Sequence, residues 1–121
     1  IQMKKLPKFL QVRQKNAELL TELLSKSNLS LPIQRKHEKV NWYLYTVTSP
    51  KRNTLLKKLN EKGVGAASYY PIPVHKTPFY KSKTKLPITE WAASKVLSLP
   101  IHPKVTTKNI EFISKSIFEI L

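Results

Sequence analysis

The sequence predicts an α/β (α+β) two-layer sandwich, in which helices pack on a small mixed or antiparallel sheet. Segments with apolar residues at three- and four-residue steps alternate with short runs of aromatic and β-branched residues. The chain has 121 residues, of which 40% are hydrophobic, enough for one domain to bury its own core. We therefore expect residues 1–121 to form a single domain.

The first predicted helix covers residues 4–26. Its apolar positions recur at helical spacing, with polar residues between them: Leu6, Leu10, Ala17, Leu20 and Leu24. Arg13 interrupts this stripe. We expect its stem to lie on the apolar surface with its charged group in solvent, and an ion pair across a domain or subunit interface is the alternative.

A run of aromatic and β-branched residues predicts a central strand over residues 40–47, buried on both faces. Ser49 and Pro50 suit the N-cap and first position of a short helix that stops at Gly63. Residues 64–69, rich in small side chains, predict a second strand that permits a bulge.

The last third of the chain predicts two more helices and a strand. Thr89 is the expected N-cap of a helix that ends near Val96, and residues 97–100 follow as a strand ended by proline. Thr106 or Thr107 caps the final helix, whose apolar face comprises Ile110, Ile113, Ile117, Ile120 and Leu121.

The segment 69–80 contains several prolines and predicts an ordered loop, because proline fixes φ and removes a hydrogen-bond donor. Loops on rigid scaffolds often carry functional residues. His75 is the histidine we single out here, and packing against Tyr70 or Tyr80 is the alternative. His102 lies between prolines, and we expect it to have a local role in a turn.

Composition excludes several classes of protein. The absence of Cys removes disulfides and thiol catalysis, and the spacing of the three His residues does not favour a metal site. All seven acidic residues are Glu, and no GxSxG motif is present, so a self-contained hydrolase is disfavoured. No apolar run reaches transmembrane length, so we expect a cytoplasmic protein with no membrane association. Because the first residue is Ile, we also expect further residues upstream.

The net charge of +15 suggests a polyanion as partner. However, the basic residues are spread along the chain, and only three of the 22 are Arg, the residue that forms bidentate contacts with phosphate. We therefore do not expect specific nucleic-acid binding. A stand-alone basic module for nucleic acid or an acidic protein is kept as the alternative function.

Six segments, taken in order and spacing, resemble the carboxy-terminal domain of the DegT/DnrJ/EryC1/StrS family of sugar aminotransferases, which are fold type I enzymes dependent on pyridoxal phosphate. They are residues 2–7, 42–45, 63–65, 70–75, 78–80 and 97–103. The resemblance covers essentially the whole chain. It implies that the family's large cofactor domain is missing upstream.

The resemblance implies a parent enzyme that transfers an amino group from glutamate or glutamine to a keto-sugar nucleotide. In the family, a lysine of the cofactor domain binds pyridoxal phosphate, and a carboxylate partners the pyridinium nitrogen. Neither is expected in this segment, so the chain alone should be inert, with no catalytic residue and no bound cofactor. Some members are dehydratases, and this segment does not separate the two.

The resemblance further implies a homodimer whose site includes a cofactor domain of the same or a companion chain. The expected substrate- or cofactor-adjacent loop residues are Tyr69, Tyr70, Pro71 and His75. The family often has His at the position of Tyr69. A phenol keeps a donor but does not titrate near neutrality, so Tyr70 and His75 are the stronger candidates.

Three functions therefore remain open: a piece of a sugar aminotransferase, a basic binding module, and a degenerate remnant kept for dimerisation. An exposed apolar face would favour the first, because removal of a large partner domain leaves an apolar patch uncovered.

Overall fold

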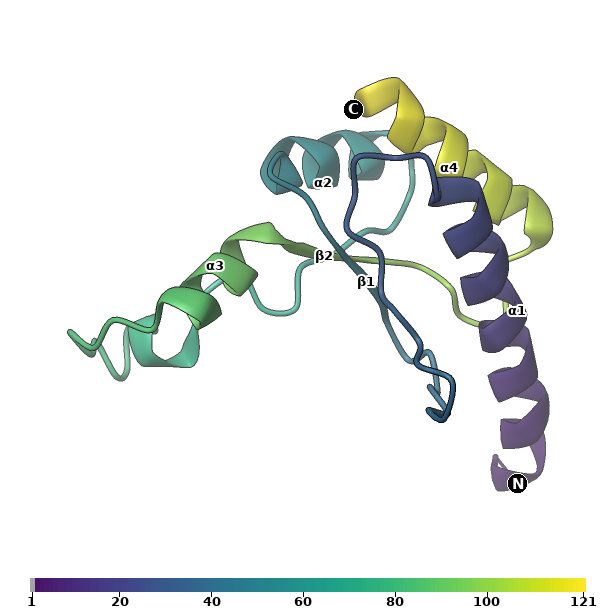
Figure 1. Ribbon diagram of the computed structural model, residues 1–121, viewed down its shortest axis with the longest axis horizontal. Coiled ribbons are helices and arrows are strands. Elements are labelled where there is room, and N and C mark those ends of the chain that lie inside the picture. Colours follow the sequence, from purple (N-terminus) through teal and green to yellow (C-terminus); the bar gives the residue numbers. More distant parts are fainter. Residues whose placement is uncertain (1) are drawn as a thin grey trace.

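A two-stranded antiparallel sheet lies at the centre of the computed structural model, which describes residues 2–121 (Figure 1). Three helices cover one face of the sheet, and a fourth projects away from it, so the predicted α/β (α+β) two-layer class with an antiparallel sheet is confirmed. The elements in chain order are a 3₁₀ turn (Met3–Lys5), α1 (Leu6–Leu24), β1 (Tyr45–Thr48), α2 (Arg52–Glu61), a second 3₁₀ turn (Val74–Lys76), α3 (Pro87–Lys95), β2 (Val96–Leu99) and α4 (Thr107–Ile120).

The register of the sheet pairs Tyr45 with Leu99 and Thr48 with Val96. Single bridges extend it on both sides, from Ser30 to Thr48 and from Ala67 to Ser98. β1 and β2 are thus flanked alike, each by the other strand and by one single bridge, so the prediction that residues 40–47 form the central strand is wrong.

The predicted strand 64–69 is wrong and shrinks to the bridge at Ala67. The amide of Ala66 donates to the carbonyl of Val64 within the same segment, at 2.7 Å, so that only Ala67 reaches the sheet.

The predicted strand 40–47 starts too early. Trp42 has a φ of 49°, in the left-handed region, which interrupts an extended backbone. Arg13 explains this turn, because its Nη1 donates to the carbonyls of Trp42 and Tyr43, both at 2.9 Å. The expectation that the charged group of Arg13 lies in solvent is therefore wrong, because it binds backbone carbonyls of another segment, whereas the alternative of an ion pair across an interface stays a prediction.

The core lies between the sheet and α1, α2 and α4. Burial alternates along β1, where Tyr45 and Val47 enter this core and the half-buried Thr46 lies on the other face, with its hydroxyl 2.9 Å from that of Ser98 on β2. β1 is thus buried on one face only, so the prediction that it is buried on both faces is wrong. β2 does not alternate, because Leu97, Ser98 and Leu99 are all buried. The fully or nearly buried apolar residues of the helices and sheet are Ala17, Leu20, Leu24, Tyr45, Val47, Leu55, Leu59, Leu97, Leu99, Ile110, Ile113 and Ile117.

The predicted apolar stripe of the first helix is right in its second half only. Leu20 and Leu24 are fully buried, whereas Leu6 and Leu10 remain exposed. The reason is that the first turns of α1 extend beyond the sheet and the other helices (Figure 1).

The helix ends confirm some predicted caps and correct others. Thr106 caps α4 in a capping box with Asn109, and Gly63, at a φ of 80°, follows α2. The predicted caps at Ser49 and Thr89 are wrong, since α2 begins at Arg52 and α3 at Pro87. Pro87 occupies the first turn, where a missing N–H has no cost, and this moves the start of α3 upstream.

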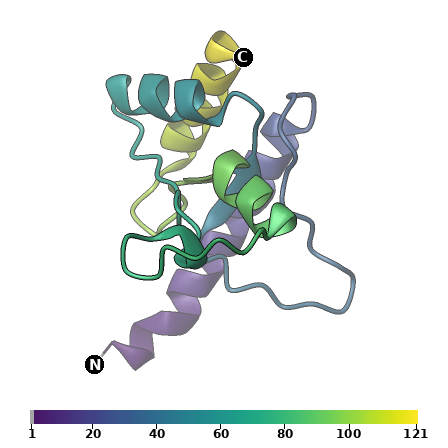
Figure 2. The ribbon, with the colours of Figure 1, turned by 90° about the vertical axis from the view of Figure 1, so that its left-hand side faces the viewer.

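Residues 69–95, here called the arm, comprise the proline-rich loop and α3. The arm projects sideways from the sheet (Figure 1) and lies in front when the molecule is turned by 90° (Figure 2). The rest of the described chain is called the body.

Candidate functional site

The four predicted loop residues lie at the start of the arm. Tyr69 and Tyr70 are exposed, and their rings meet edge to face with centroids 6.0 Å apart. Pro71 is exposed as well, whereas the His75 side chain is only 12% exposed. The rings of Tyr69 and Tyr70 thus contact each other, whereas the His75 ring contacts a different residue.

That contact is with Glu90 at the start of α3, and not with an aromatic ring. Nε2 of His75 lies 3.2 Å from Oε1 of Glu90. The same carboxylate accepts a hydrogen bond from Nζ of Lys76 at 2.6 Å and one from the amide of Leu86 at 3.0 Å. Chiefly the Lys76 bond, then the Leu86 amide and His75, lower the pKa of Glu90 to about 2.

Both ends of the arm are fixed to the body. Arg52, which is buried, donates from Nη2 to the carbonyl of Ala93 at 2.8 Å and from Nε to that of Ser94 at 3.2 Å. These are carbonyls of the last turn of α3, where a helix lacks internal partners and favours a cation. The Ser68 hydroxyl, just before the arm, donates to the carbonyl of Val96, just after it, at 3.0 Å, so the two body residues that flank the arm are held together.

A hollow of about 230 Å³ lies where the arm leaves the sheet. Tyr69 lines it together with Arg13, Tyr43, Ser98 and His102. The Arg13 guanidinium stands 5.6 Å from the centre of the Tyr43 ring, a cation–π distance. Sequence reasoning missed Arg13 and Tyr43 as neighbours of Tyr69, because no local pattern relates residues that far apart.

His102 has the predicted role in a turn. Its Nδ1 accepts the amide of Lys104 at 3.3 Å, and its carbonyl accepts the amide of Val105 at 2.8 Å.

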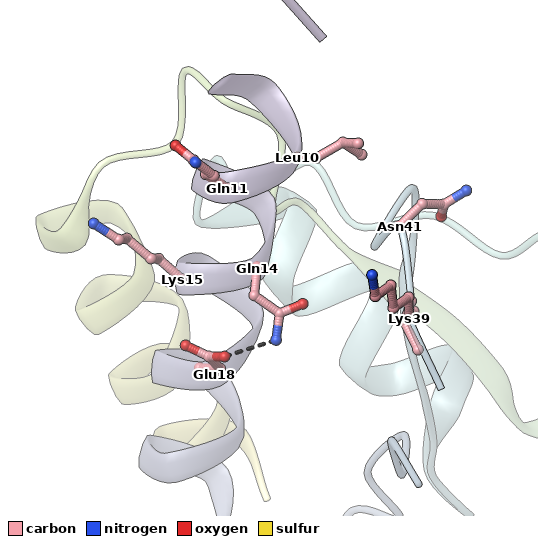
Figure 3. Close-up of a pocket in the computed structure, with 8 residues that line it drawn as sticks. Leu10, Gln11, Gln14, Lys15, Glu18, Lys39 and Asn41 are labelled. Carbon is pink, nitrogen blue, oxygen red and sulfur yellow. Dashed lines mark hydrogen bonds between the residues drawn. The ribbon is translucent and has the colours of Figure 1, made fainter. Parts of the chain in front are cut away.

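A wider groove of about 700 Å³ runs between α1 and residues 39–41 (Figure 3), and none of the four predicted loop residues lines it. Two of the polar side chains that line it bond to each other, since Nε2 of Gln14 donates to Oε1 of Glu18 at 2.7 Å. Oε1 of Gln14 accepts the indole N–H of Trp42, also at 2.7 Å. Size alone therefore does not make this groove the candidate site.

The described residues do not fit a pyridoxal phosphate site. A lysine that forms a Schiff base is held in a desolvated pocket, whereas every lysine here is exposed except Lys95, which is half-buried. Across residues 2–121 no group of three potential metal ligands is found. None of the helices in this range is long and apolar enough to cross a membrane.

The arm leaves most of its large apolar side chains in solvent. Phe79 is 87% and Ile88 82% exposed. Such clustering is unusual for a free monomer and marks surfaces that meet another protein. The exposed large apolar residues of the arm are Tyr69, Tyr70, Ile72, Val74, Phe79, Tyr80, Leu86, Ile88 and Trp91.

The fold and this arm are those of a known group of proteins. The chain belongs to the DegT/DnrJ/EryC1/StrS aminotransferase family, whose model matches residues 1–118. A pleiotropic regulatory protein of Geobacillus stearothermophilus is 31% identical, a match that covers 94% of this chain and 32% of that protein. A dTDP-3-amino-3,4,6-trideoxy-alpha-D-glucose transaminase of Streptomyces venezuelae is 35% identical, over 72% of this chain and 24% of the enzyme.

Solved structures agree. DesV of S. venezuelae, crystallised in complex with a ketimine intermediate, superposes with a TM-score of 0.90 at 27% identity, covering 97% of this chain and 33% of DesV. The aminotransferase TlmJ of Streptoalloteichus hindustanus gives 0.89 at 27% identity, covering 96% of this chain and 32% of TlmJ. The predicted fold, that of fold type I sugar aminotransferases, is confirmed. The chain spans a quarter to a third of the length of these relatives.

Proposed function

We propose that residues 1–121 are the carboxy-terminal domain of a pyridoxal phosphate-dependent aminotransferase that acts on a keto-sugar nucleotide, with glutamate or glutamine as amino donor. The observation that carries the proposal is the family match over residues 1–118. The named transaminase among the relatives acts on a dTDP-sugar, which supports this substrate class.

The cofactor domain belongs, in this proposal, to the same or a companion chain. Pyridoxal phosphate, when bound there, supplies an electron sink for the carbanion formed during transfer. Because no lysine of this chain lies in a desolvated pocket, the chain contributes no step through the cofactor and is inert alone. Its share is to cover one side of the active-site cleft and to support a homodimer.

The loop residues Tyr69, Tyr70, Pro71 and His75 approach the substrate or cofactor. Ligand sites favour the junctions between domains, and exposed tyrosine rings offer both apolar surface and a hydroxyl donor. Tyr70 and His75 are the residues that we expect to matter most for turnover.

The test is reconstitution with a cofactor domain, followed by a transamination assay with glutamate or glutamine and a set of keto-sugar nucleotides. We expect His75→Ala to lower turnover while leaving the melting temperature nearly unchanged. His37→Ala is the matched control, because His37 is an exposed histidine outside the arm. Unchanged kinetics of His75→Ala would remove this residue from the site.

Absence of any transamination in the reconstituted protein would count against the aminotransferase. Binding to a nucleic-acid duplex that weakens steeply with added salt would favour the basic binding module instead, since counterion release drives such binding.

A further inference from the structure

Glu90 joins three parts of the arm at one carboxylate. Its oxygens accept from His75 and Lys76 in the 3₁₀ turn and from the amide of Leu86 just before α3. The backbone of His75 is held as well, because its carbonyl accepts the amide of Ser82 at 2.9 Å. His75 is thus held twice: its ring contacts Glu90 of α3, and its carbonyl binds the amide of Ser82 in the loop that leads to α3.

The chemistry of the carboxylate decides which nitrogen of His75 carries the proton. With its pKa lowered to about 2, Glu90 is ionised near neutral pH, and an ionised carboxylate accepts hydrogen bonds but cannot donate one. The contact at 3.2 Å therefore requires a proton on Nε2 of His75. No residue in the range 2–121 hydrogen-bonds to Nδ1, which is the acceptor of the neutral ring.

We propose that Glu90 is a positioning residue for His75: it holds the ring with Nε2–H toward α3 and leaves Nδ1 free to accept a hydrogen bond from a hydroxyl or amino group of the ligand. This inference rests on the proposed function, in which the loop approaches the substrate. A carboxylate bound to one ring nitrogen commonly fixes the tautomer and orientation of a functional imidazole.

α3 connects the His75–Glu90 contact to the body. Glu90 lies in the first turn of α3, and the carbonyls of Ala93 and Ser94 in its last turn accept hydrogen bonds from the buried Arg52 of α2. His75, Glu90 and Arg52 therefore form a continuous path from the loop to the buried core.

The test is the tautomer ratio of His75 in the 121-residue chain, measured from the ¹⁵N shifts of the ring nitrogens at about pH 9, well above the ordinary range of an imidazole. We expect the ratio of Nε2–H to Nδ1–H in His75 to exceed that of the exposed His37 by about five-fold or more, as a charge-assisted hydrogen bond requires. Glu90→Ala should bring the ratio to the His37 value. It should also speed exchange of the Ser82 amide several-fold, because the loop opens.

Glu119→Ala is the matched control, because Glu119 likewise pairs with one lysine, Lys62, at 2.8 Å but lies on α4 in the body. It should leave both readouts of the arm unchanged. Equal ratios for His75 and His37 in the unmodified chain, or the same ratio in Glu90→Ala and Glu119→Ala, would overturn the positioning role. Neither readout needs substrate, so a failed transamination assay would overturn the proposed function alone.

Discussion

The body and the arm treat their apolar residues in opposite ways. In the body, Leu20, Leu55 and Ile117 are completely buried between the sheet and three helices. In the arm, residues of the same kind, such as Phe79 and Ile88, are more than four-fifths exposed. The body therefore accounts for its own stability by burial, whereas the arm is held mainly by hydrogen bonds at Glu90 and Arg52.

This difference in burial separates the residues that stabilise the fold from those whose apolar side chains are available to contact another protein surface. Apolar side chains that stay exposed add no burial to the stability of this fold, and their clustering is explained if another surface covers them. In the proposed function that surface is the cofactor domain, and relatives such as DesV are about three times as long as this chain.

Leu20→Ala should destabilise the chain by about 2–5 kcal/mol, because it leaves a cavity in a packed core. Leu10→Ala, on the same helix but exposed, is the control and should change the free energy of unfolding by less than about 1 kcal/mol. Denaturant titrations of both variants measure this. Equal effects would contradict the burial assigned to the two halves of α1.

Arg52→Ala should cost about 2–3 kcal/mol, because it removes charged hydrogen bonds and leaves carbonyls of α3 without partners. It should also speed amide exchange in α3 more than in α4, since the arm loses its tie to the body. Arg35→Ala, whose side chain is 84% exposed, is the control and should have almost no effect. Identical exchange in α3 of both variants would show that Arg52 does not hold the arm.

Ile88→Ser should leave the stability of the chain within about 0.5 kcal/mol of the original, because the side chain is exposed. Its affinity for the cofactor domain should nevertheless fall about ten-fold or more, as for an apolar residue at the centre of an interface. Ile33→Ser, equally exposed but outside the arm, is the control for binding measured by calorimetry. Equal binding by both variants would sink the assignment of the arm as the interface.

Acid should loosen the arm before the body. The folded-state pKa of Glu90, about 2, is below its ordinary value of 4.5, so its contribution is complete above about pH 4.5 and is lost as the pH falls toward 2. Glu90→Gln should flatten this part of the pH dependence of Ser82 amide exchange. Glu119→Gln should not change it. An unchanged profile in Glu90→Gln would mean that another group causes the acid response.

The parts of the fold that follow from local patterns were predicted. The periodicity of α1 and α4 identified Leu20 and Ile110 as core residues, and Thr106 was recognised as a cap. The loop residues Tyr69, Tyr70, Pro71 and His75 were also chosen from the sequence, on the basis of its prolines and of the resemblance, and their roles stay predictions.

The parts that were missed depend on contacts between distant residues. Arg13 and Arg52 bind backbone carbonyls 29 to 42 positions away, and Glu90 contacts His75, 15 positions away; a sequence has no periodic signal for such pairs. The late start of β1 has the same origin, because the carbonyl of Trp42, at the turn before the strand, accepts a hydrogen bond from Arg13 of α1. The contact of Glu90 with His75 was likewise not predicted.

The most direct test of the account is the solvent accessibility of Trp91 with and without the cofactor domain. The chain has two tryptophans, of which Trp42 is 6% and Trp91 56% exposed, so a Trp42→Phe variant reports on the arm alone. We predict that acrylamide quenches Trp91 readily in the 121-residue chain and much less in the protein made from the complete reading frame. Equal quenching in both, or a reading frame that starts directly before Ile1, would contradict the account.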